Sequence, residues 1–428
     1  MIQLVEKDEN TTRTYVQQLK QRCDEKDRKV DAIVADILEN VRSNGDKAVA
    51  EYTLKFDGSI PEQVEITKEQ MKELTKQCDA YFLEALERAA KNIHEFHSRQ
   101  KQQSWLDTKD NGVILGQRVR GLAKVGIYVP GGTAAYPSSV LMNAIPAKIA
   151  GVQEIVMVTP PGKDGKPNPD IMAAALVAGV DRVFLVGGAQ AVAALAYGTE
   201  TMPKVDKIVG PGNIFVATAK KHLYGTVDID MIAGPSEILI VADETANPKY
   251  LAADLMSQAE HDVLASAILL TTSSKIAEET IAQIYEQVER LERKDIINKS
   301  LDDFGAVIVC DTMDEAIEFA NDLAPEHLEV CVANPLEYIG RLDNAGSLFL
   351  GNYSPEPLGD YYAGPNHVLP TSGTARFFSP LSVDSFIKKS SFIYYTQDAL
   401  KAAKDDIVAL AEAEGLTAHA NSIKVRSE

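Results

Sequence analysis

Two patterns of hydrophobic and polar positions divide the chain near residue 110. Before that point, apolar residues recur every three to four positions among many charged ones, as in DAIVADILENVR and EALERAAKNIHEFHSRQ. This spacing predicts amphipathic helices. After it, short β-branched runs alternate with alanine-rich stretches such as SSVLMNAIPAKIAG and AQAVAALAYG. The predicted strands are KVGIYV, EIVMV, RVFLVG, KIVG, EILIVAD, SAILLT, AVIVC and LEVCV.

Continuous apolar strands that alternate with helices are typical of parallel sheets covered on both faces. We therefore expect an α/β fold with two parallel-sheet units and a boundary near residue 236. Beyond residue 380 the pattern predicts a short strand, an amphipathic helix over 396–415 and a tail. The apolar side of that helix is too small to form a core of its own, so we expect the helix to dock on another surface.

The composition restricts the possible partners. The chain has 428 residues, 45% of them hydrophobic, and a formal net charge of −19. This charge disfavours nucleic acid and anionic membranes as partners. The stretch MIQLVEKDEN lacks the apolar core of a signal peptide, and no apolar run is long enough to span a bilayer, so we expect a cytoplasmic protein. The four cysteines show no CxxC spacing, and we expect Cys310 and Cys331 to be buried, reduced thiols.

Loops rich in glycine and proline follow several of the predicted strands. YVPGGTAAYPSS, VGGAQA and VGPGNIFVATAKK stand where open α/β sheets bind ligands, next to helix N-termini. The functional interpretation is a cradle for a cofactor or a phosphate, and the structural one is ordinary turn chemistry. None of the loops matches GxGxxG, so the pattern alone does not identify NAD.

A possible metal site begins in DLMSQAEHD. Asn247 and Pro248 suit the start of a helix, and on that helix Gln258 and His261 lie about 60° apart, so their side chains can converge. The alternative is a polar border on a half-buried helix. Oxygen and nitrogen ligands without thiolates suit zinc, manganese or cobalt. Asp360, in a long irregular stretch, is a further possible carboxylate ligand.

Other polar residues also admit two interpretations. In LAPEHLEV, Glu326 and His327 are either a general acid/base pair or part of a helical first turn, where an acid is favourable. Four further residues stand in loops or at helix ends, where turn formation, capping or solvation is the alternative to a ligand role: Ser236, His367, Glu414 and His419. Sequence spacing does not show which of these residues meet.

Several long motifs, taken together, resemble those of histidinol dehydrogenase. They are YVPGGTAAYPSSVLMNAIPAKIAGV, VGPGNIFVATAKK, DMIAGPSE, DLMSQAEHD, APEHLE and LGDYYAGPNHVLPTSGTARF, in that family's order and over nearly the whole chain. The resemblance implies oxidation of L-histidinol to L-histidine through the aldehyde with two NAD⁺, the last steps of histidine biosynthesis. It also implies one zinc per active site, a homodimer and an incomplete Rossmann-like fold, which fits the missing glycine fingerprint.

The resemblance also implies roles for single residues. The implied zinc ligands are Gln258, His261, Asp360 and His419. The implied acid/base residues are Glu326 and His327. The implied substrate contacts are Ser236, Gln258, His261, His327, Asp360, His367, Glu414 and His419. The implied nucleotide contacts are Tyr128, Gln190 and Asn213.

The expected organisation has four parts. These are an N-terminal helical arm over 1–25, a first α/β domain from 26–124 and 237–380 with the metal and acid/base residues, a nucleotide-binding α/β domain over 125–236, and a C-terminal dimerisation tail over 381–428. The resemblance implies that this tail docks on the partner subunit and delivers Glu414 and His419 to the partner's site.

Three alternatives remain open. A zinc hydrolase would use the same metal and base but no nucleotide. A family relative would oxidise another small alcohol. Aldehyde oxidation through a cysteine thiohemiacetal needs an activated thiolate in an open site, which Cys310 and Cys331 do not suggest.

Overall fold

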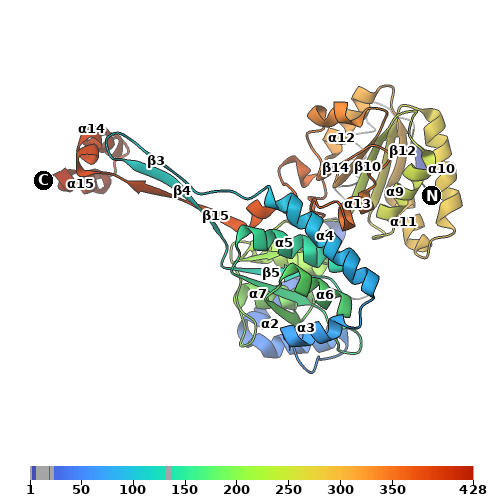
Figure 1. The fold of residues 1–428 in the computed structure, drawn as a ribbon, viewed down its shortest axis with the longest axis horizontal. Helices are drawn as coiled ribbons and strands as arrows, with labels where there is room; N and C mark the ends of the chain where they lie inside the picture. Colours follow the sequence, from blue (N-terminus) through green and yellow to red (C-terminus); the bar gives the residue numbers. More distant parts are fainter. Residues whose placement is uncertain (1, 6–18, 20–23, 132–135, 428) are drawn as a thin grey trace.

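A computed structural model describes residues 2–5, 19, 24–131 and 136–427. These residues form two α/β domains and an extended arm (Figure 1). The predicted α/β fold with two parallel-sheet units is therefore confirmed. Within the described ranges, no helix combines the length and the apolar character that crossing a membrane requires.

The first domain is built on a six-stranded parallel sheet. In spatial order its strands are β1 (Gln3–Val5), β12 (Gly305–Val309), β11 (Ser266–Thr271), β10 (Glu237–Ala242), β13 (His327–Cys331) and β14 (Ser347–Leu350). One face packs on α9 (Pro248–Ala259), α10 (Ser274–Val288) and α11 (Lys294–Phe304), and the other on α12 (Met313–Leu323). Successive β10 side chains alternate between these two cores, Ile238 entering one and Leu239 the other.

The second domain also contains a six-stranded sheet. In spatial order its strands are β2 (Glu65–Ile66), β7 (Arg182–Leu185), β6 (Glu154–Thr159), β5 (Lys124–Tyr128), β8 (Lys207–Val209) and β9 (Asp228–Ile229). β2 runs antiparallel to β7, and the other pairs are parallel. One face packs on α3 (Lys68–Thr75), α4 (Ala80–Ser98), α5 (Pro137–Ala150) and α6 (Pro169–Ala178). The other packs on α2 (Asp24–Asp57), α7 (Gly188–Tyr197) and α8 (Ile214–Leu223).

The N-terminal helices pack differently from the expected grouping of 26–124 with 237–380. Helices α2, α3 and α4 and strand β2 belong to the second domain, where Met71 and Leu86 share a core with Ile155. A helical segment was expected over residues 1–25, but its start forms strand β1, which extends the first sheet beside β12. Most of the rest of residues 1–25 lies outside the described residues. An amphipathic pattern shows that a helix needs an apolar partner surface, but not which sheet supplies it.

The arm consists of three antiparallel strands and two helices. β3 (Trp105–Thr108), β4 (Ile114–Gly121) and β15 (Ile387–Tyr394) form its sheet, which carries α14 (Gln397–Ala413) and α15 (Thr417–Lys424) away from both domains (Figure 1). The strand and helix predicted beyond residue 380 are confirmed as β15 and α14. Leu400 and Ile407 on α14 are half-buried and Leu410 is exposed, so this chain covers the apolar side of α14 only in part.

Short elements complete the described chain. α13 (Glu356–Tyr361) follows β14, and its position next to β13 matters for the site. Four single 3₁₀ segments span Pro335–Arg341, Thr374–Arg376, Val383–Phe386 and Val425–Ser427. The predicted helix start is confirmed in α9, where Asn247 accepts a hydrogen bond from the backbone N–H of Lys249 and Pro248 occupies the first turn.

Candidate active site

His327 is the first residue of β13, and its ring is held in one orientation. Its Nδ1 lies 3.0 Å from the carbonyl oxygen of Glu237, to which it donates as an N–H. Nε2 is buried and has no hydrogen-bond partner in the described part of the chain. Burial lowers the pKa of His327. A neutral ring with Nδ1 protonated leaves a lone pair on Nε2, which is what a general base or a metal ligand requires.

Glu326 lies on the Nδ1 side of the ring. One of its carboxylate oxygens accepts the backbone N–H of Glu237 at 3.0 Å and lies 3.6 Å from Nδ1 of His327. Both side chains therefore bind backbone groups of Glu237, the first residue of β10. Because Glu326 faces Nδ1 and the lone pair is on Nε2, the two neighbours can serve different protons.

Two carboxyl groups from α13 face Nε2 of His327. Glu356 Oε1 lies 3.8 Å from Nε2 and Asp360 Oδ1 lies 3.9 Å from it. Burial, and then the charge of Asp360, raise the pKa of Glu356 to about 10. The ligand atoms of these three residues are close enough together to hold a metal ion.

Glu356 was not among the residues expected from the sequence. It lies four residues before Asp360, which places both on the same face of a helix. Two flanking prolines, Pro355 and Pro357, hid this helix within a stretch that looked irregular. The i, i+4 spacing of two acids was the available signal.

Gln258 and His261 come from the end of α9. Gln258 is 1% exposed, and its Oε1 has no hydrogen-bond partner among the described residues. The helix ends at Ala259, so His261 lies in the turn that follows rather than on the helix, and it is exposed. Its charge contributes, after burial, to lowering the pKa of both His327 and His367. The expected convergence of the pair on one site is therefore compatible with the fold.

His367 connects the two domains. Its Nδ1 lies 3.1 Å from the carbonyl oxygen of Asp360, and its Nε2 lies 3.4 Å from the hydroxyl of Ser139 in the first turn of α5. Burial lowers the pKa of this imidazole. Ser139 was not expected from the sequence. Its contact shows that the second domain borders the histidine and carboxylate cluster of the first.

A buried carboxyl pair ties the supporting elements together. Asp254 on α9 is hydrogen-bonded to Glu329 on β13, and burial raises the pKa of Asp254 to about 6 and that of Glu329 well above its usual range. Glu329 Oε1 also accepts the backbone N–H of Glu356 at 2.8 Å. The pair thereby joins the three elements that carry Gln258, His327 and Asp360.

The expected nucleotide contacts lie at one edge of the second sheet. Tyr128 ends β5, Gln190 lies in the first turn of α7 after β7, and Asn213 precedes α8 after β8. The Tyr128 hydroxyl accepts the N–H of Gly188 at 3.0 Å. Gln190 is 1% exposed, and neither of its amide atoms has a hydrogen-bond partner within the described chain. Part of the YVPGGTAAYPSS loop, residues 132–135, lies outside the described residues.

The remaining expected residues are Ser236, Glu414 and His419. Ser236 is half-buried immediately before β10, and its carbonyl oxygen accepts the N–H of Ser266. Glu414 and His419 are exposed on the arm, which Figure 1 shows pointing away from both domains. One chain therefore does not bring His419 to Gln258, His261 and Asp360.

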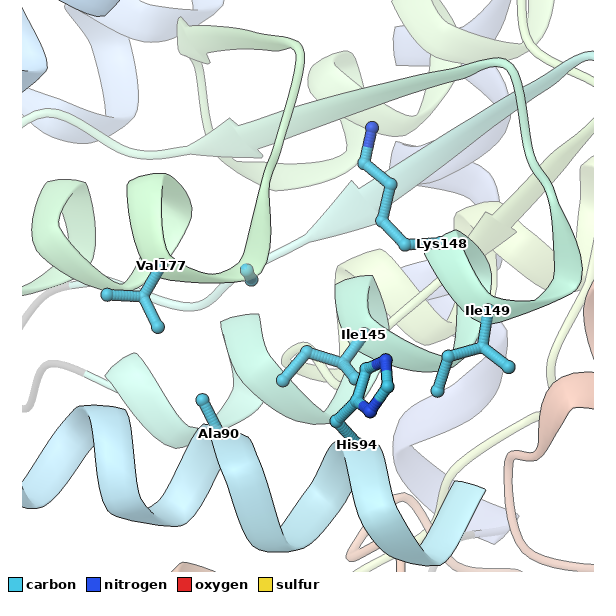
Figure 2. A pocket seen from close by; sticks show the side chains of 7 residues that line it. Ala90, His94, Ile145, Lys148, Ile149 and Val177 are labelled. Carbon is cyan, nitrogen blue, oxygen red and sulfur yellow. The ribbon is translucent and has the colours of Figure 1, made fainter. Parts of the chain in front are cut away.

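Two surface pockets lie away from the expected site residues. One of about 280 Å³ lies between α4, α5 and α6, with apolar walls, His94 and Lys148 (Figure 2). Lys148 is already paired with Asp181 at 2.7 Å. The second, of about 490 Å³, lies between α2 and the end of α7, around Gly45 and Glu200.

The fold and the site define a two-domain α/β protein with a buried histidine and carboxylate cluster at the border of its domains. The family model for histidinol dehydrogenase matches residues 20–427, and the chain belongs to that family. It is 61% identical over 412 residues to histidinol dehydrogenase of Clostridium acetobutylicum, covering 96% of each chain. It is 59% identical to that of Caldanaerobacter subterraneus, covering 92% of this chain and 91% of the relative. The crystal structure of histidinol dehydrogenase from Elizabethkingia anophelis superposes with a TM-score of 0.93 at 39% identity, covering 99% and 98% of the two chains.

Proposed function

We propose that this protein oxidises L-histidinol to L-histidine through histidinaldehyde, with two NAD⁺, in the last steps of histidine biosynthesis. The observation that carries the proposal is the orientation of His327 within a chain of this family. Its Nδ1 is bound to Glu237, and its buried Nε2 faces the interior of the site. We place this activity in the cytoplasm, where a dinucleotide-dependent biosynthetic step is expected.

The residues present fit one zinc ion. Gln258 offers a buried Oε1 that has no partner in the described structure, Asp360 offers a carboxylate, and His261 offers an imidazole in the adjoining turn. The fourth ligand in this proposal is His419 of a second copy of the chain. When bound, zinc would anchor the nitrogen atoms of the amino alcohol and so orient its reacting carbon.

His327 and Glu326 carry the proton transfers. In the first oxidation, Nε2 of His327 takes the hydroxyl proton as a hydride leaves the same carbon for NAD⁺, which yields the aldehyde. Glu326 then takes a proton from water as the water oxygen adds to the aldehyde carbon, and the protonated Nε2 of His327 returns its proton to the aldehyde oxygen, which gives the hydrate and a neutral His327. In the second oxidation, His327 takes a hydrate proton as the second hydride leaves, which yields the carboxylic acid.

Holding the intermediate in one site keeps a reactive aldehyde out of water between the two steps. The substrate contacts in this proposal are Ser236 and His367 from the same chain and Glu414 from the partner. Glu356 lines the same site, with Oε1 3.8 Å from Nε2 of His327, and burial raises the pKa of its carboxyl group.

The homodimer is part of the same proposal. The arm carries exposed Trp105, Leu106, Ile393 and Leu410, which are large apolar side chains that a monomer would leave in water. Exchange of such an element between identical subunits builds a symmetric dimer and brings Glu414 and His419 to the partner's site.

The alternatives are less well supported. Cys310 and Cys331 are buried, and burial raises the pKa of the Cys331 thiol, which is the opposite of what a thiolate nucleophile needs. A zinc hydrolase would leave Tyr128, Gln190 and Asn213 without a dinucleotide to contact. A relative acting on another small alcohol would have no need of His367 and Glu414 as substrate contacts.

The direct test is NADH formation when histidinol and NAD⁺ are added to the purified protein. We expect two NADH per histidinol, loss of activity after chelation and recovery with zinc. Gln258→Leu should lower the zinc content measured by metal analysis, whereas Gln103→Leu, which changes an exposed glutamine, should not. Absence of NADH formation by the zinc-loaded protein would refute the activity, and full activity in verified metal-free protein would refute the zinc site.

A further inference from the structure

A buried ion pair holds the loop that links β8 to α8. Lys220 on α8 and Asp230, just after β9, form a salt bridge, and their side chains are 3% and 1% exposed. Nζ of Lys220 also donates to the carbonyl oxygen of Gly210 at 3.1 Å, and Oδ2 of Asp230 accepts the N–H of Gly210 at 2.8 Å. Both backbone polar groups of one loop glycine are therefore bound by the two members of a single ion pair.

The backbone conformation of Gly210 restricts this position to glycine. Its φ of +108° lies in a region that L side chains rarely adopt. A Cβ atom at this position would collide with the carbonyl oxygen of Tyr128. Tyr128 ends β5, the strand beside β8, so the loop packs directly against the strand end that carries one of the proposed nucleotide contacts.

The same loop delivers a second proposed contact. Asn213 caps α8, with Oδ1 accepting the N–H groups of Phe215 and Val216 at 3.0 and 3.2 Å. The oxygen is thus committed to the helix, and the Nδ2 amino group is the part of the side chain that can donate to a ligand. The position of that amino group depends on the backbone conformation of residues 210–213.

We propose that Lys220 and Asp230 are positioning residues for the dinucleotide. By fixing Gly210 they hold residues 210–213 in the shape that presents Asn213 to the nucleotide, and this inference rests on the proposed use of NAD. Stability alone does not require charges here, because apolar residues of similar volume often stabilise an interior as well as a buried ion pair does. Apolar residues, however, cannot bind the N–H and C=O of Gly210.

The domain offers a matched control. Lys207 and Asp228 form a second ion pair at 2.9 Å, between the neighbouring strands β8 and β9. The side chain of Lys207 is 9% exposed and that of Asp228 is 53% exposed. This pair has the same residue types and lies in the same sheet, but neither hydrogen bond of Gly210 described above involves it.

The test compares Lys220→Met/Asp230→Leu with Lys207→Met/Asp228→Leu. We expect the first double variant to raise the Kd for NADH about tenfold or more, because small displacements of positioning groups have effects of this size. The KM for histidinol and the zinc content should stay unchanged. The control variant should bind NADH as the wild type does. Unchanged NADH binding by the first variant would overturn the inference, as would an equal loss of histidinol affinity, which indicates general damage.

A measurement on the wild-type protein tests the inference even if the double variant does not fold. Hydrogen exchange of the peptide 207–216 should be slow before NAD⁺ is added, because the ion pair already holds Gly210. Protection that arises only with NAD⁺ would overturn the inference. If the wild type binds no NADH at all, the proposed function fails as well, whereas wild-type binding without the expected variant effect refutes only the role of the ion pair.

Discussion

The two residues at the start of β13 are neighbours in sequence but meet different surroundings. Glu326 and His327 both contact Glu237, yet the lone pair of His327 points toward Glu356 and Asp360 while Glu326 lies on the Nδ1 side. A base and a water-activating carboxylate can therefore act at different stages on one bound molecule.

His327→Asn should slow both half-reactions by about 10²–10⁴-fold, the usual contribution of a general base. Glu326→Gln should slow mainly the oxidation of histidinaldehyde, because only that step needs an activated water. Each half-reaction is followed by NADH formation, starting from histidinol or from the aldehyde. Zinc content and thermal midpoint serve as controls for folding. Equal losses in both half-reactions for Glu326→Gln would contradict its assigned role.

A histidine outside the site should shape the response to acid. His97 is fully buried at the end of α4, and its Nδ1 is 2.7 Å from Gln100. Burial lowers the pKa of His97 in the folded state. Below about pH 6.5 this histidine binds a proton in the unfolded chain but not in the folded one. The free energy of unfolding therefore falls by up to about 1.4 kcal/mol for each pH unit of acidification.

His97→Asn keeps a donor toward Gln100 but cannot take up this proton. Its thermal midpoint should therefore fall less than that of the wild type between about pH 7 and pH 5. His94→Asn, which changes an exposed histidine on the same helix, is the matched control. Identical pH dependence in wild type and His97→Asn would show that His97 does not limit stability in acid.

At the scale of elements, the sequence predicted the strands that are continuous apolar runs buried in a sheet. All eight predicted strands form, as β5 to β8 in one sheet and β10 to β13 in the other. Strands with little buried apolar surface were missed: β2 has two residues, and all four residues of β3 are exposed. Such strands are defined by the pairing they find rather than by their own pattern.

The site shows the same limit. Motifs identified Glu326, His327 and Asp360 because their sequence contexts are unusual, but whether side chains meet depends on how elements pack. Glu356 reaches His327 because α13 lies beside β13, and Ser139 reaches His367 because the two domains adjoin there. The grouping of the N-terminal helices with the second sheet also depends on packing, which helical periodicity does not specify.

At the scale of the whole molecule, the arm separates residues that the proposed zinc site needs together. Glu414 and His419 lie on the arm, while Gln258, His261 and Asp360 lie in the first domain (Figure 1). If each site takes three ligands from one chain and His419 from the other, two defective chains should complement each other.

His261→Ala and His419→Ala should each be inactive as homodimers. In a mixed dimer, one site receives both substitutions and the other receives neither, so one site of the two is intact. After the two variants are unfolded and refolded together in equal amounts, half of the dimers are mixed, and roughly a quarter of wild-type activity should return. His261→Ala mixed with Gln258→Leu is the control, because both changes affect ligands from the same domain and every site then carries one defect. A mixture that stays inactive, although differently tagged subunits are recovered together, would show that His419 acts within its own chain.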